Sequence, residues 1–127
     1  MPLFVESDAL PTVRLKYVGL YSDAELEHML RELETVLALS GRKVALLDLT
    51  KAKGATAKQR QMQAQWIGIH EQRLRRDFAA AAIVTDNALI RGVVTAVFWI
   101  RPLPLPTEIT ATIAQAEAWL APYIAKL

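Results

Sequence analysis

The sequence contains no cysteine and only two histidines, His28 and His70, among its 127 residues. Without cysteine, the chain has no disulfide, no thiol nucleophile, no iron–sulfur cluster and no cysteine-ligated zinc site. Two histidines provide little material for a metal centre or for imidazole-based catalysis. We therefore expect no metal ion, no cofactor and no enzymatic activity.

The sequence also lacks a long uninterrupted apolar segment. Residues 79–100 form the longest apolar stretch, but Asp86, Asn87 and Arg91 interrupt it. Such a stretch is too short and too charged to span a bilayer. No basic region precedes an apolar run at the N-terminus, which argues against a signal peptide. A cytoplasmic protein that does not insert into membranes is expected.

The composition is that of one folded domain. Hydrophobic residues make up 53% of the chain and charged residues 22%, which is too apolar for a disordered protein. A chain of this length buries roughly two-thirds of the surface that its unfolded form exposes, so it can fold without disulfides or metals. We predict a single domain over residues 1–127.

The charges are unevenly distributed although the net charge is only +2. Residues 1–40 contain three basic and seven acidic residues, whereas residues 41–76 contain nine basic and two acidic residues. A basic segment can face an anion, or it can be an ordinary solvated helix face. Because no recognised nucleic-acid-binding motif accompanies these cations, we do not expect nucleic acid to be a partner.

Strand and helix patterns alternate along the chain. Alternating or continuous apolar residues predict strands near residues 4–5, 13–17, 44–49, 78–85 and 108–111. Helices are predicted after the capping pairs Ser22–Glu25, Thr56–Gln59 and Thr112–Gln115, and over residues 87–100. The predicted order is ββαβαβαβα. This order indicates an α/β fold with a mixed sheet of about five strands and about four helices.

The predicted helix over residues 87–100 is apolar nearly all round, so its large side chains cannot all face one core. We assign to the core the side that carries Leu89, Val93, Ala96, Val97 and Ile100. The side chains then left for an exposed partner or dimer surface are Ile90, Val94, Phe98 and Trp99, with Leu103 and Leu105 of the proline-rich segment beside them. A homodimer is the simplest occupant of such a surface. The alternative is a helix that the rest of the fold covers completely.

The loop between the central strand and the next helix is basic. Residues 51–58 precede a helix start, where backbone N–H groups often face an anion, but the segment lacks the second glycine of a Walker A loop. We interpret Thr56 primarily as a helix cap and secondarily as a possible phosphorylation site. Lys53 and Lys58 are the candidate anion contacts.

Three segments resemble bacterial STAS-like domains of the anti-sigma-factor-antagonist type. They are the strand that ends Leu-Leu-Asp48-Leu-Thr50, the segment from Ile83 to Trp99, and the segment from Glu108 to Leu120. The resemblance implies a STAS-like two-layer α/β domain that binds another protein without catalysis, often under phosphorylation control. The regulated hydroxyl of that family lies at the start of the helix after the central strand, where this chain has Thr56 without a preceding aspartate.

Two functions follow from this comparison. The first is a non-catalytic regulatory module that binds another protein, or itself as a homodimer, through an apolar helix surface. The alternative is a module of the same fold that binds a lipid-like or other small apolar ligand in a cleft. An exposed apolar patch would favour the first, and a concave pocket with a few polar groups would favour the second.

Overall fold

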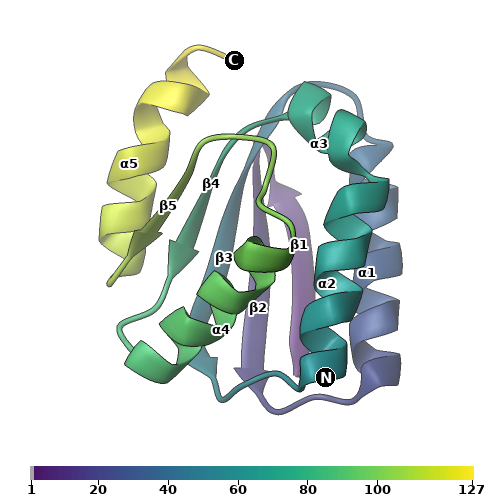
Figure 1. Cartoon of the computed structure of the whole chain (residues 1–127). Coiled ribbons are helices and arrows are strands. Elements are labelled where there is room, and N and C mark those ends of the chain that lie inside the picture. Colours follow the sequence, from purple (N-terminus) through teal and green to yellow (C-terminus); the bar gives the residue numbers. More distant parts are fainter. Residues whose placement is uncertain (1) are drawn as a thin grey trace.

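The computed structural model describes residues 2–127, which form a five-stranded sheet covered by helices on both faces (Figure 1). The elements in chain order are β1 (Leu3–Ala9), β2 (Thr12–Gly19), α1 (Asp23–Leu37), β3 (Lys43–Ala52), α2 (Ala57–Ile69), α3 (Glu71–Asp77), β4 (Phe78–Val84), α4 (Ala88–Ile100), β5 (Thr107–Thr110) and α5 (Ile113–Ala125). The predicted mixed α/β sheet is confirmed. Within residues 2–127, no helix is both long enough and apolar enough to cross a membrane.

The strands lie in the sheet in the same order as in the sequence, β1-β2-β3-β4-β5. β1 is antiparallel to β2, with Leu3 opposite Tyr17, so the first two predicted strands form a hairpin. The other neighbours are parallel. Connections between parallel strands are right-handed, so successive crossovers in one direction place α1, α2 and α4 on the same face (Figure 1).

Alternate residues of the two central strands serve two separate cores. Ala45 and Leu49 of β3 point into the larger core, beneath α1, α2 and α4. Val44 and Leu46 point the other way, into a smaller core that α5 covers with Ala116 and other apolar side chains. Burial on both faces explains why β3 and β4 are continuous apolar runs.

The predicted helix starts are confirmed at three positions. Ser22, Thr56 and Thr112 each accept a hydrogen bond from the backbone N–H three residues later, and the side chain of that later residue accepts from the cap N–H. These reciprocal bonds satisfy backbone donors that no helical carbonyl reaches.

The single helix predicted after the Thr56–Gln59 pair is two helices, which raises the helix number to five. α2 ends at Ile69, and His70 lies between α2 and α3. The Nδ1–H of His70 donates to the Trp66 carbonyl oxygen at 2.9 Å, and the His70 backbone N–H donates to the same oxygen at 3.1 Å. The apolar periodicity continues across the break, so hydrophobic spacing alone did not reveal it.

Candidate functional site

A largely apolar cavity of about 140 Å³ lies between the sheet and helices α1, α2 and α4. Ala45 of β3 and Ala81 of β4 line it, and their short side chains leave space above the centre of the sheet. Apolar lining also comes from Leu15, Leu30, Leu33, Leu37, Leu47, Leu49, Ile67, Ile83, Val93 and Phe98, among others. A cavity of this composition is suited to an apolar molecule.

Helix α4 and the proline-rich segment after it form one wall of the cavity. Ile90, Val94 and Val97 of α4 line the space, and the backbone of α4 approaches that of α2. Leu103 and Leu105, half-buried in the extended segment before β5, line the cavity as well. The cavity is therefore bounded by elements that lie far apart in the sequence.

Four side chains with polar atoms join the apolar lining: Tyr17, Tyr21, Gln63 and Trp66. The Tyr17 hydroxyl donates to Gln63 Oε1 at 3.4 Å, and the two tyrosine rings lie 6.0 Å apart. Burial raises the pKa of Tyr17 well above its ordinary value, and the neighbouring Tyr21 raises it further. Burial also raises the pKa of Tyr21, although its hydrogen bond with Gln63 opposes that shift. Both phenols therefore stay neutral at ordinary pH.

The orientation predicted for α4 is wrong. Ile90 and Val94, assigned to an exposed partner surface, are only 2% and 7% exposed, whereas Leu89, assigned to the core, is 68% exposed. The physical reason is that a helix with apolar residues on nearly all sides can turn more than one of these sides toward the core, and a shift of one position rotates its core face by about 100°. Arg91 and Thr95 are exposed together with Leu89, so the polar residues alone do not define the outer side.

The other residues predicted for the partner surface divide into two groups. Phe98, Leu103 and Leu105 are half-buried and pack against the larger core, so they belong to the cavity wall. Trp99 is 86% exposed, in agreement with the prediction of exposure. Leu89 and Ile100, also exposed on α4, accompany it. The exposed apolar side chains of α4 therefore share only Trp99 with the predicted surface, and Leu89 and Ile100 had been assigned to the core.

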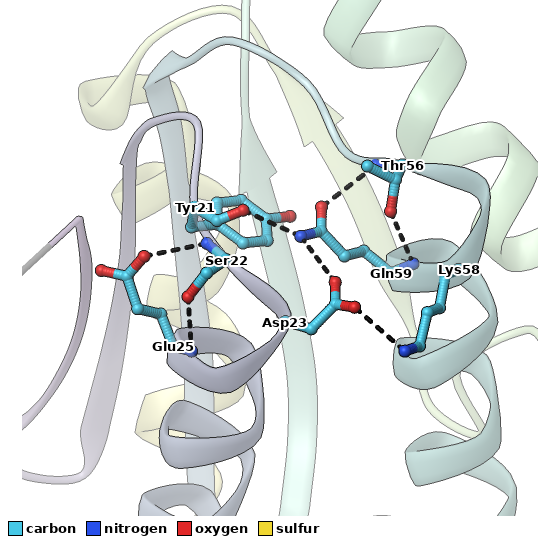
Figure 2. A network of polar contacts seen from close by, with 7 residues as sticks. All are labelled: Tyr21, Ser22, Asp23, Glu25, Thr56, Lys58 and Gln59. Atoms are coloured by element: carbon cyan, nitrogen blue, oxygen red, sulfur yellow. Dashed lines mark hydrogen bonds and ion pairs between the residues drawn. The ribbon is translucent and has the colours of Figure 1, made fainter.

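Thr56 takes part in a polar network that joins the start of α2 to the start of α1 (Figure 2). Its hydroxyl accepts from the Gln59 backbone N–H at 3.1 Å, which confirms the predicted cap. The buried Gln59 amide donates to the Tyr21 carbonyl at 2.8 Å and to Asp23 at 3.2 Å, and Lys58 pairs with Asp23 at 3.1 Å. The network fixes the relative position of the two helices at this end of the sheet.

The side chains of the predicted anion site are exposed, and one of them already has an ionic partner. Lys53 and Thr56 are exposed, whereas Lys58 is bound to Asp23. Asp23 offsets the charge of Lys58 in this pair, which weakens the attraction of Lys58 for another anion. Phosphorylation of Thr56 and anion binding by these lysines stay predictions.

No carboxylate or imidazole cluster suited to a metal ion occurs within residues 2–127. The buried Asp48 carboxylate accepts hydrogen bonds from the Thr50 hydroxyl at 2.6 Å and from the Thr50 N–H at 3.0 Å. These bonds give Asp48 a structural role within β3.

The arrangement can be compared with known proteins. The sequence model of the SpoIIAA-like family matches residues 12–121. The chain belongs to the SpoIIAA-like family. No curated protein matches it at a significant level. A solved structure of an uncharacterised protein of the DUF3478 family from Shewanella loihica PV-4, described as having a SpoIIAA-like fold, is similar to it with a TM-score of 0.68. The two are 21% identical over 93% of this chain and 91% of the other.

Sequence reasoning did not find the cavity or its polar lining residues. Tyr17 was predicted only as a strand residue, and neither Gln63 nor Trp66 was singled out. One signal was available, since Gln63 and Trp66 lie three positions apart and so share a helix face. In this SpoIIAA-like chain that face points to the alanine-rich centre of the sheet.

Proposed function

We propose that this SpoIIAA-like protein is a non-catalytic binding module whose cavity beside α4 takes a small apolar molecule. The observation that carries the proposal is the cavity of about 140 Å³ on the inner face of the sheet, lined almost entirely by apolar side chains. An engineered cavity of about 150 Å³ with a similar lining stays dry and binds benzene. The size therefore favours a compact molecule or ring over a whole lipid.

Benzene is the simplest probe of this proposal. We expect it to raise the melting temperature of the protein, because a ligand that binds only the folded state stabilises that state. It should also shift the amide NMR signals of the lining strands β3 and β4 and of α4. A folded wild-type protein whose melting temperature and spectrum do not respond to saturating benzene would contradict the proposal.

A matched pair of substitutions on α4 locates the binding. Val93 is half-buried and lines the cavity, whereas Thr95 is exposed on the same helix. Val93→Phe should fill part of the cavity and weaken benzene binding at least tenfold. Thr95→Phe adds an aromatic ring outside the cavity and should leave the binding unchanged. Equal effects of the two substitutions would place the bound benzene elsewhere.

The exposed side of α4 supports a second candidate function, regulation through binding of another protein. Trp99 and Leu89 are large, apolar and mostly exposed, and such side chains concentrate at interfaces. Arg91 is the only charged residue among the 13 residues of α4. The partner that fits is a protein surface with an apolar depression and an acidic rim.

This second function is tested with a photo-reactive amino acid at position 99 in the native host. A cross-linked protein, once identified and purified, should bind the wild type in a salt-sensitive manner and bind Trp99→Ser at least tenfold more weakly. Arg91→Glu should also weaken the complex, whereas Thr95→Ser is the control on the same helix. Sedimentation could instead show that the wild type is a dimer and that Trp99→Ser is a monomer. That result would identify a second copy of the chain as the partner bound at α4, and it would contradict an acidic partner protein.

A further inference from the structure

The indole of Trp66 has a buried N–H group that no hydrogen-bond acceptor within residues 2–127 satisfies. Buried donors in folded proteins almost always have a partner, so an exception calls for an explanation. Trp66 lines the apolar cavity. A bound molecule with a hydrogen-bond acceptor would supply the missing partner.

The position of the Trp66 ring is fixed by contacts that do not use its N–H group. The imidazole of His70 stacks on the indole, with 4.4 Å between the ring centres and 29° between the planes. The Nδ1–H of His70 also donates to the Trp66 carbonyl at 2.9 Å. The hydrogen bond holds the imidazole, and the imidazole stacks on the indole, so the N–H group of Trp66 is oriented before any ligand binds.

Further polar groups lie on the same part of the cavity lining. Gln63 is one helical turn before Trp66 on α2, so the two side chains share a face. The bond from the Tyr17 hydroxyl to Gln63 is long, at 3.4 Å. These groups give the cavity one polar region within a lining that is otherwise apolar.

The lining contains no aspartate, glutamate, lysine, arginine or histidine among the described residues. A carboxylate or ammonium group in the cavity would lose its hydration without gaining an opposite charge, which is strongly unfavourable. The tyrosines do not provide a charge either, since burial raises the pKa of both. The occupant must therefore be neutral.

We infer that the occupant of the cavity is an uncharged, compact apolar molecule with one carbonyl, ether or hydroxyl oxygen, and that this oxygen accepts a hydrogen bond from the Trp66 indole N–H. The inference rests on the proposed ligand-binding function and adds the chemical class of the ligand. Specificity then comes from one donor, because a ligand without the acceptor leaves that donor unsatisfied.

Two ring compounds of nearly equal shape test the inference. Cyclohexanone has a carbonyl oxygen where methylenecyclohexane has a CH₂ group, and cyclohexanecarboxylate adds a charge. After correction for their partition from water into an apolar solvent, cyclohexanone should bind the wild type at least fivefold more tightly than methylenecyclohexane. The carboxylate should bind more weakly than both. Binding is measured by the shift in melting temperature and by NMR titration.

The indole N–H signals provide a direct readout. The chain contains three tryptophans, and the Trp66 signal can be assigned by elimination with Trp99→Phe and Trp119→Phe. Cyclohexanone should move the Trp66 N–H proton downfield, and methylenecyclohexane should not. Trp66→Phe should abolish the preference for the ketone while the variant still binds methylenecyclohexane. If that variant does not fold, the response of the Trp66 N–H signal of the wild type to the two compounds is the test of the inference.

The outcomes separate this inference from the function on which it rests. Binding of both ring compounds with equal affinity, and without a shift of the Trp66 signal, would overturn the inference and leave a cavity for apolar ligands. Preferred binding of the carboxylate would overturn the neutral ligand class. A folded protein that binds neither neutral compound and no benzene would overturn the proposed function itself.

Discussion

At the scale of single residues, Tyr17 couples folding to pH. Its phenol is buried against the cavity, and burial raises its pKa above the ordinary value of about 10. The neutral phenol thus favours the folded state fully below pH 10. This contribution is lost as the pH rises above 10, because the unfolded chain then releases a proton that the folded chain keeps.

We predict that the free energy of unfolding of the wild type decreases more steeply between pH 10 and 11.5 than that of Tyr17→Phe. One proton accounts for a difference in slope of at most about 1.4 kcal/mol per pH unit. Urea unfolding at a series of pH values measures both slopes, and Tyr123→Phe on the opposite side of the sheet is the matched control. Equal slopes for the wild type and Tyr17→Phe would argue against this coupling.

Thr56 is the second residue whose role can be measured. Its hydroxyl caps α2, and its backbone N–H donates to Gln59, which in turn holds Tyr21 and Asp23. Thr56→Ala should lower the free energy of unfolding by about 1 kcal/mol, the typical effect of losing such a cap. Thr95→Ala, which removes an exposed hydroxyl on α4, should change it by less than about 0.5 kcal/mol. The comparison fails if the two variants are equally stable.

At the scale of elements, α4 is the part of the fold whose orientation decides the site. Val94 is buried in the cavity wall and Leu89 is exposed. Val94→Ala should destabilise the protein by about 2 kcal/mol, because it removes buried methyl groups and enlarges the cavity. Leu89→Ala removes more carbon atoms but should cost less than about 0.5 kcal/mol. The reverse order in denaturant unfolding would restore the orientation expected from the sequence.

The elements differ in how far the sequence predicts them. Capping pairs such as Ser22–Glu25 are local hydrogen bonds between neighbouring residues, so three helix starts could be predicted correctly. The rotation of α4 depends on the whole molecule, since Ile90 and Leu89 are equally apolar and only packing distinguishes them. The cavity depends on Ala45 and Ala81 meeting beneath that helix, which is a tertiary relationship that hydrophobic spacing does not encode.

At the scale of the whole molecule, the two cores share the same strands. β3 and β4 contribute alternate side chains to the two cores, so unfolding of these strands disrupts both cores at once. We predict a single cooperative unfolding transition for the chain, as is usual for a domain of this size. In a background with Trp99→Phe, Trp66 reports on the larger core and Trp119, which packs against the smaller core, reports on the other side.

The test uses two single-tryptophan variants, one that keeps only Trp66 and one that keeps only Trp119. In each variant, the midpoint of urea unfolding measured by tryptophan fluorescence should equal the midpoint measured by circular dichroism. Two separate midpoints within one variant, one by fluorescence and one by circular dichroism, would show that the cores unfold independently.

The position of α5 at the end of the element order has a consequence for synthesis on the ribosome. β1 to β5 pair with their predecessors in the order in which they emerge, so the sheet can form progressively. The face of the sheet that forms the smaller core, with Val44, Leu46 and Val84, stays exposed to solvent until residues 113–125 leave the exit tunnel. A nascent chain arrested before that point carries an uncovered apolar β-surface, which is where a chaperone would bind it and where two such chains would aggregate.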